Sequence, residues 1–263
     1  MQRVRDRLWA WAHEAGSHTT AEWGVPEPSR MTPVEGAVYL GVPNVIMVRY
    51  NGRPAPPYHQ YALPLRAMRE VVWSVVGAGA ASDPADRAQV LALRDELPNL
   101  TGVMMDDVFG VPPDSGRTAA LSLDELRELR AALRGPGRPL NLWSVIYDHE
   151  LQRPVGEYLA LCDRVSLWTS RSSELVHLER NLATLERLAP TADKVLGCYL
   201  WDYEPRQPMS IANMERQCEQ GLHWLRDGRI TGLILLATCI CDLDLDAVEW
   251  TRRWIAAVGD QPL

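Results

Sequence analysis

One stretch of this chain reads Leu-Asn-Leu-Trp-Ser-Val-Ile-Tyr-Asp-His-Glu, from Leu140 to Glu150. Its first seven residues, Leu140–Ile146, form a short and mostly apolar run, and four residues with polar, reactive side chains follow directly. An apolar run of this length is typical of a strand that is buried on both faces, as in a parallel sheet. The stretch therefore predicts a buried strand that ends at a chemically capable loop.

The same pattern recurs along the whole chain at intervals of roughly thirty residues, and helical periodicity lies between the runs. Strands that alternate with helices predict a parallel sheet. Eight such units in 263 residues match one α/β domain, a single (β/α)8 TIM barrel, whose active site lies at the carboxyl ends of the strands. The eight runs are Leu8–Trp11, Asn44–Val48, Val71–Val76, Thr101–Met105, Leu140–Ile146, Arg164–Trp168, Val195–Trp201 and Gly232–Ala237.

The composition restricts the partners and the environment of the protein. The formal net charge is −7, which argues against a nucleic-acid partner, because such proteins present a basic surface. Neither a signal peptide nor an apolar run long enough to cross a membrane is visible, and the five cysteines are expected to be buried, reduced thiols. We therefore expect a cytoplasmic protein. Since no linker divides the chain, we expect one barrel domain over residues 1–263.

Acidic side chains that follow two of the predicted strands are the strongest candidates for catalysis. Asp106 and Asp107 follow the fourth strand, and Asp202 and Glu204 follow the seventh. Strands four and seven lie across the mouth of an eight-stranded barrel, so carboxylates at their ends could flank a bound substrate. Hydrolysis of a glycosidic bond uses such a pair, one group as general acid and the other as nucleophile or as base for water.

Alternation along a strand refines these assignments. Neighbouring residues point to opposite sides of a strand, so we expect only one of Asp106 and Asp107 to enter the cavity, and we favour Asp107 as the acid/base. By the same alternation Asp202 and Glu204 face one side, with Tyr203 opposite, and either acid is the expected partner. The alternative for each acid is a structural role, in which it caps the next helix or pairs with arginine.

The chain contains ten tryptophans and one phenylalanine, and several of the tryptophans fall on predicted strands. Barrel interiors are usually filled by Val, Ile and Leu, so this pattern predicts a cavity lined by flat aromatic faces. Indole faces suit the C–H surfaces of sugar rings, and they also suit cations. A small carbohydrate or glycoside is the expected ligand. The expected substrate-binding residues are His13, Glu14, Arg49, Asn51, Trp73, Trp143, Tyr147, Trp168, Tyr199 and Trp201.

Histidines support a competing hypothesis. His13, His18, His59 and His149 fall in loops at the same end of the predicted barrel, and with the nearby acids they could bind a divalent metal, as in barrel isomerases and lyases that act on sugars. Their spacing matches no recognised ligand pair, and our first expectation is that no cofactor or metal is required. His149 is also a candidate acid/base partner of a carboxylate.

Three segments resemble a known group of proteins. They are Val103–Asp107, Leu142–Leu151 and Gly197–Tyr203, and they are similar to uncharacterised bacterial TIM-barrel proteins that resemble glycoside hydrolases. The broader resemblance, to barrel glycosidases, implies an acid/base after the fourth strand and a nucleophile after the seventh. Those enzymes typically use two glutamates, whereas this sequence has Asp106-Asp107 at the first position.

The sequence therefore predicts a glycoside hydrolase-like enzyme, a hydrolase with a carboxylate pair at the carboxyl ends of the barrel strands. Asp107 is the expected acid/base, and Asp202 or Glu204 is its expected partner. A metal-dependent sugar isomerase or lyase and a non-catalytic sugar-binding barrel are the two alternatives. The sequence leaves the sugar, the stereochemical outcome and the oligomeric state open.

Overall fold

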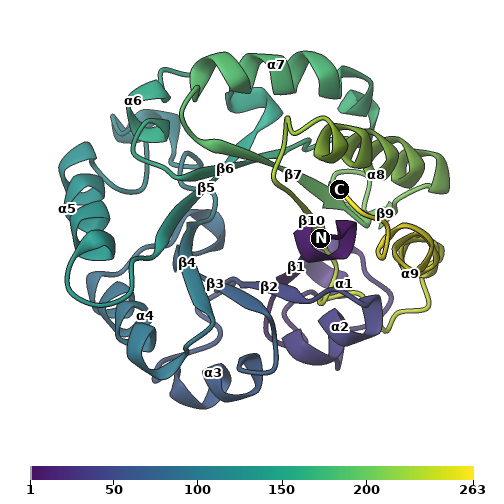
Figure 1. The fold of residues 1–263 in the computed structure, drawn as a ribbon, viewed down its shortest axis with the longest axis horizontal. Helices are drawn as coiled ribbons and strands as arrows, with labels where there is room; N and C mark the ends of the chain where they lie inside the picture. Colours follow the sequence, from purple (N-terminus) through teal and green to yellow (C-terminus); the bar gives the residue numbers. More distant parts are fainter. Residues whose placement is uncertain (1) are drawn as a thin grey trace.

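The computed structural model describes residues 2–263 and contains a closed barrel of eight parallel strands. Around the barrel the strands follow the order β1-β10-β7-β6-β5-β4-β3-β2, so each strand lies beside its predicted neighbour in the chain (Figure 1). The predicted (β/α)8 TIM barrel is confirmed. The barrel strands are β1 (Leu8–Ala12), β2 (Asn44–Met47), β3 (Glu70–Val76), β4 (Leu100–Met105), β5 (Asn141–Tyr147), β6 (Arg164–Trp168), β7 (Asp193–Tyr199) and β10 (Gly232–Leu236).

Helices surround the barrel and cover the outward faces of its strands (Figure 1). Two of them begin with a capping box, in which Thr32 and Ser122 each bond with the glutamate three residues later. The α-helices are α1 (Thr20–Trp23), α2 (Pro33–Leu40), α3 (His59–Leu65), α4 (Pro84–Glu96), α5 (Leu123–Arg134), α6 (Gly156–Leu159), α7 (Leu178–Leu188), α8 (Ile211–Arg226) and α9 (Asp246–Val258). Short 3-10 helices cover Val4–Arg7, Ala78–Ala80, Pro113–Ser115, Asp148–Glu150 and Ser172–His177.

The seventh strand differs from its prediction. The run Val195–Trp201 was expected to form one strand, but β7 ends at Tyr199. The next two residues, Trp201–Asp202, form the separate strand β8, which pairs antiparallel with β9 (Gln207–Pro208) outside the barrel. The chain therefore turns away from the barrel wall at Leu200, and this turn decides where the following acids point.

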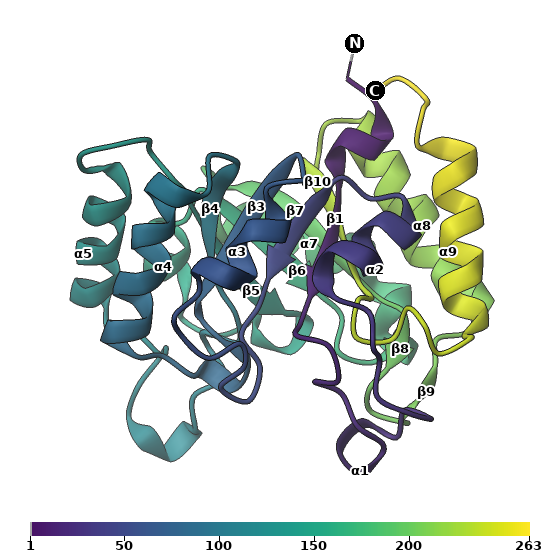
Figure 2. The same cartoon turned by 90° about the horizontal axis from the view of Figure 1, so that it is seen from below.

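Different segments of the chain lie at the two ends of the barrel (Figure 2). The chain termini lie together at the amino ends of the strands, where Leu263 N donates to the Gln2 carbonyl at 3.0 Å. The loop that contains α1 and the β8–β9 pair lie at the opposite end, beyond the carboxyl ends of the strands. No helix among residues 2–263 is both long enough and apolar enough to cross a membrane.

Candidate active site

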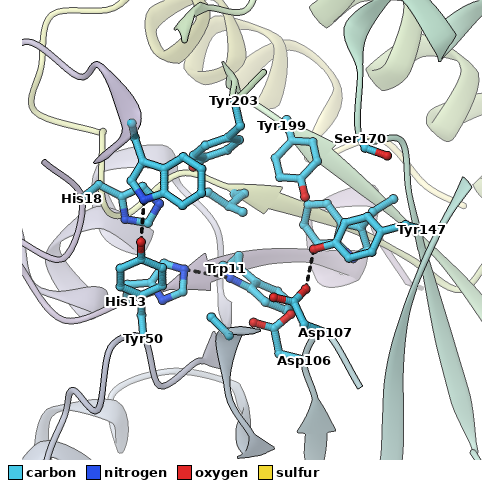
Figure 3. Close-up of a pocket in the computed structure, with 14 residues that line it drawn as sticks. Trp11, His13, His18, Tyr50, Asp106, Asp107, Tyr147, Ser170, Tyr199 and Tyr203 are labelled. Atoms are coloured by element: carbon cyan, nitrogen blue, oxygen red, sulfur yellow. Dashed lines mark hydrogen bonds between the residues drawn. The ribbon is translucent and has the colours of Figure 1, made fainter. Parts of the chain in front are cut away.

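A cavity of about 200 Å³ opens at the carboxyl ends of the barrel strands. Most of the side chains that line it are aromatic, histidine or carboxyl groups (Figure 3), and the lining residues come from all eight strand ends. We refer to it as the aromatic pocket. Its lining residues are Trp11, His13, His18, Trp23, Tyr50, Ala78, Asp106, Asp107, Tyr147, Trp168, Ser170, Tyr199, Tyr203 and Leu236.

Asp106 and Asp107 both line the aromatic pocket, although alternation predicted that only one of them would. Asp106 continues the direction of β4, and its backbone N donates to the Val76 carbonyl at 3.0 Å. Asp107 has a positive φ of 45°, a conformation that is uncommon outside glycine but several-fold enriched in aspartate. Because β4 ends at Met105, strand alternation no longer applies at Asp107, and its side chain turns back toward Asp106.

The two carboxyl groups have different environments. Asp106 is buried, and this burial raises its pKa well above the usual range, as does the charge of the neighbouring Asp107. The site thus favours the protonated form of Asp106. Two carboxyls whose environments differ in this way are typical of acid/base centres.

Asp107 accepts hydrogen bonds from two donors on neighbouring strand ends. The Tyr147 hydroxyl donates to its Oδ1 at 2.7 Å, and the Gly79 backbone N donates to its Oδ2 at 2.7 Å. Burial raises the pKa of Tyr147 well above its usual range, so this hydroxyl keeps its proton and remains a donor. These two bonds fix the orientation of Asp107 within the pocket.

The floor of the aromatic pocket is built from two tryptophans. The Trp11 and Trp168 rings meet edge to face with centroids 5.2 Å apart. Trp168 Nε1 donates to Ser166 Oγ at 3.0 Å, and the ring lies over Gly197, where a Cβ atom would be 2.1 Å from the indole. Only glycine leaves space for this ring, so Gly197 on β7 helps to place Trp168 beneath the ligand position.

Histidine and aromatic rings form the wall opposite the carboxyl pair (Figure 3). Trp11 Nε1 donates to His13 Nε2 at 3.2 Å, so His13 Nδ1 bears the proton and donates to the Val48 carbonyl at 3.2 Å. Burial lowers the pKa of His13 to about 4 and that of His18 to about 3. Both rings are therefore neutral near pH 7, and this wall adds no charge to the pocket.

His18 is the centre of an aromatic cluster in that wall. Its ring stacks on Trp23 at 5.9 Å and lies 5.1 Å from the Tyr50 ring, measured between centroids. Trp23 Nε1 donates to the Tyr50 hydroxyl at 2.6 Å, and the Tyr203 ring meets Trp23 edge to face at 5.1 Å. The cluster presents flat apolar faces and few free polar groups toward the cavity.

The structure does not bring Asp202 and Glu204 to the aromatic pocket. The two acids share one side of the chain, as alternation predicted, but Tyr203 is the residue that faces the pocket. Asp202 is buried and lines a separate surface cavity, whereas Glu204 is exposed and pairs with Arg171 at 2.8 Å. The cause is the turn at Leu200, which reverses the side that each residue presents. The expected carboxylate pair across the mouth is therefore absent.

Three of the predicted binding tryptophans lie elsewhere in the barrel. Trp73 is buried against Tyr58, with centroids 5.4 Å apart. Trp143 is buried against Trp9 at 5.0 Å, below the Arg164 guanidinium. Trp201 is buried, and its Nε1 donates to the Trp23 carbonyl at 3.0 Å, so it supports the loop that contains Trp23. None of the three lines the aromatic pocket.

Four predicted polar residues also lie outside the aromatic pocket. Arg49 pairs with Asp86 on α4, and Glu14 accepts a hydrogen bond from Arg53 Nε at 3.1 Å. Asn51 is exposed near Glu22. His149 is exposed and stacks on Tyr147 with an interplanar angle of 12°. Their local partners explain why these side chains point away from the pocket.

The predicted residues that do meet in the aromatic pocket are Asp106, Asp107, His13, Tyr147, Trp168 and Tyr199. Sequence reasoning did not assign Trp11, His18, Trp23, Tyr50, Ser170 and Tyr203 to substrate binding, although all six line the pocket. Each follows or ends a predicted strand, and this position is the signal that could have identified them. Within residues 2–263, no three His, Cys, Asp or Glu side chains lie close enough together to hold a metal ion.

No protein-family model matches the sequence, and no curated protein matches it. Solved structures do match the fold. Active domain 2 of a thermostable chitinase from Pyrococcus furiosus, in a structure with chito-oligosaccharides, aligns with a TM-score of 0.58 and 13% identity over 98% of this chain and 97% of that chain. The PgaB (BpsB) glycoside hydrolase domain from Bordetella bronchiseptica aligns with a TM-score of 0.55 and 13% identity over 88% and 92%.

A third match has a different activity. The tryptophan synthase α-subunit from Pyrococcus furiosus aligns with a TM-score of 0.51 and 11% identity over 98% of this chain and 99% of that chain. The chain thus has the barrel fold of glycoside hydrolases, which agrees with the resemblance inferred from its sequence. Since the same fold serves unrelated enzymes, the function has to be argued from the pocket.

Proposed function

We propose that this protein is a glycoside hydrolase that binds one sugar ring in the aromatic pocket and cleaves its glycosidic bond with the Asp106–Asp107 pair. The observation that supports this most strongly is the pair itself. Asp106 is buried, which raises its pKa well above the usual range, and it adjoins Asp107, which is fixed by two donors in a cavity with aromatic walls. Pairs of carboxyls with separated environments perform acid/base chemistry in many glycosidases.

The size and lining of the aromatic pocket support a single sugar ring. Its volume of about 200 Å³ is smaller than the roughly 300–1,000 Å³ of sites for larger ligands. Trp11 and Trp168 supply flat faces for the C–H side of a ring, and Tyr147, Tyr199 and Ser170 supply hydroxyl groups for hydrogen bonds. The chitinase and the PgaB domain, whose folds this chain shares, are named as carbohydrate-active proteins.

In the proposed reaction the pair holds one proton. This proton passes through Asp107 to the glycosidic oxygen as the bond from that oxygen to the anomeric carbon breaks, and the two carboxylates stabilise the positive charge that develops on the sugar. Water then bonds to the anomeric carbon and returns a proton to the pair. The two carboxyls belong to adjacent residues at the end of one strand, whereas the carboxyls of retaining and inverting enzymes flank the bond at ~5 Å or ~6.5–9.5 Å from each other, so the pair acts from one side of the sugar.

The test is a screen of aryl glycosides, in both anomeric forms, with and without a 2-acetamido group. We expect hydrolysis of at least one glycoside. A requirement for the acetamido group would show that the substrate itself supplies the nucleophile, a route known for some glycosidases. If no glycoside is hydrolysed and yet a sugar binds, the protein is a sugar-binding barrel and the proposed activity is wrong.

Tyr147 should act as a positioning residue for Asp107. Replacing it with Phe removes the 2.7 Å hydrogen bond to Oδ1, and hydrogen bonds to charged groups contribute about 1.5–3 kcal/mol. We expect Tyr147→Phe to lower kcat by about 10- to 100-fold and to shift the acidic limb of the pH–rate profile to higher pH, because the charged form of the pair loses a donor. Kinetics between pH 4 and 8 measure both effects.

The matched control for this variant is Tyr158→Phe. Tyr158 packs edge to face against Phe109 at 6.0 Å and does not line the aromatic pocket, so its profile should be that of the wild type. An unchanged pH profile in Tyr147→Phe, even with a lower kcat, would contradict the positioning role.

A further inference from the structure

A second and larger cavity adjoins the aromatic pocket. Its volume is about 700 Å³, and its walls come from the loops after β5 and β6, from the first turn of α7 and from the segment after β8. Ser170 and Tyr203 line both cavities, so a ligand in the aromatic pocket could extend directly into the second one. We refer to the second cavity as the polar groove.

The shared wall is held in place by a hydrogen-bond network. Ser170 Oγ donates to Asp148 Oδ1 at 2.5 Å, and the Ser170 backbone N donates to the same oxygen at 3.2 Å. His149 Nδ1 lies 3.0 Å from Ser170 Oγ, and the His149 ring stacks on Tyr147 at 5.5 Å. Because Tyr147 also holds Asp107, the groove and the carboxyl pair are built on the same set of side chains.

Asn181 indicates that the polar groove receives a ligand. The residue is only 7% exposed and lines the groove, yet its side-chain amide makes no hydrogen bond to any part of the chain that the structure describes. The amide atoms of Asn181 are not fully buried, so they are open to the groove and can bind a group from outside the chain. An amide offers two donors and one acceptor, which suits the hydroxyl groups of a sugar.

We propose that the polar groove binds the sugar unit next to the one held in the aromatic pocket, so that the substrate is a saccharide of at least two units. The inference rests on the proposed function and adds to it the length of the substrate. Asn181 would bind hydroxyl groups of the second unit, with Arg180 beside it on α7. The chain of the saccharide would cross from one cavity to the other between Ser170 and Tyr203.

The test measures binding as a function of saccharide length. Chito-, cello- and malto-oligosaccharides of one to four units are titrated by calorimetry into the Asp107→Asn protein, which binds without turnover. We expect a disaccharide or longer saccharide of at least one series to bind about tenfold or more tightly than its monosaccharide, equivalent to about 1.4 kcal/mol. Asn181→Ala in the same background should remove most of this gain and leave the affinity for the monosaccharide unchanged.

Two further variants distinguish a loss of contacts in the groove from a folding defect. Arg180→Ala changes the exposed part of the same wall and should also reduce the gain. Arg187 lies on the same helix, contacts Thr184 and does not line the groove. Arg187→Ala should therefore leave the gain in affinity intact. Equal affinities for mono- and oligosaccharides, or a gain that survives both groove variants, would overturn the inference and leave the proposed function standing. If no saccharide binds at all, both fail.

Discussion

Asp107→Asn is expected to lower kcat on any glycoside found in the screen by at least about a thousandfold. Asparagine keeps the size of the side chain. Its carbonyl oxygen can accept from the Gly79 N–H and its amide N–H can donate to the Tyr147 hydroxyl oxygen, but it can neither take up nor release a proton. A thousandfold loss corresponds to about 4 kcal/mol of transition-state stabilisation. Affinity for the ligand should change by no more than about threefold, well under 1 kcal/mol, since the floor and walls of the aromatic pocket are untouched. Turnover kinetics together with calorimetry separate the two effects.

The matched control is Asp202→Asn, another buried aspartate beyond the carboxyl end of a strand. It lies outside the aromatic pocket, so kcat should stay within about twofold of the wild type, a difference of less than 0.5 kcal/mol. This comparison also decides between two arrangements of the site. Large losses in both Asp202→Asn and Asp107→Asn would restore the carboxylate pair across the mouth that the sequence predicts. A large loss in Asp202→Asn with little change in Asp107→Asn would refute the adjacent pair.

The barrel could be predicted because its signal is local. Each strand needs only a short apolar run that fits a sheet buried on both faces, and the spacing of these runs fixes their order around the barrel. Thr32 and Ser122 begin helices for an equally local reason, since each caps the backbone with help from a glutamate three residues later. These features follow from contacts within a few residues of the chain.

The site was harder to predict because it depends on how the chain leaves each strand. Alternation correctly predicted that Asp202 and Glu204 lie on the same side of the chain. Because the chain turns at Leu200, however, Tyr203 is the residue that faces the pocket. At the end of β4 the positive φ of Asp107 brings both acids into the pocket. Trp73 and Trp143 look like binding residues in the sequence, yet both are buried away from the pocket, Trp73 against Tyr58 and Trp143 against Trp9. One backbone dihedral angle that departs strongly from strand values changes the side on which every following side chain lies.

The neutral histidines predict a loss of stability in mild acid. The pKa of His13 is lowered to about 4 and that of His18 to about 3, whereas an unfolded histidine titrates near 6.5. As the pH falls below about 6.5, the two histidines bind protons in the unfolded state but stay neutral in the folded state, so the free energy of unfolding decreases. At pH 5 the loss is about 2 kcal/mol for each histidine, or about 4 kcal/mol for the two, relative to pH 8.

Asp106 acts in the opposite direction and must be removed from the measurement. Its raised pKa means that the folded state retains a proton that the unfolded state has lost, a destabilisation that is relieved as the pH falls. Urea unfolding of Asp106→Asn between pH 8 and 5 therefore isolates the histidines, and His18→Phe in that background keeps a ring against Trp23 and Tyr50 without a titrating group. We expect the second substitution to restore about 2 kcal/mol at pH 5 relative to pH 8. All other titrating groups are common to the two proteins and cancel in the difference, so identical pH dependences would mean that His18 does not remain neutral in the folded pocket.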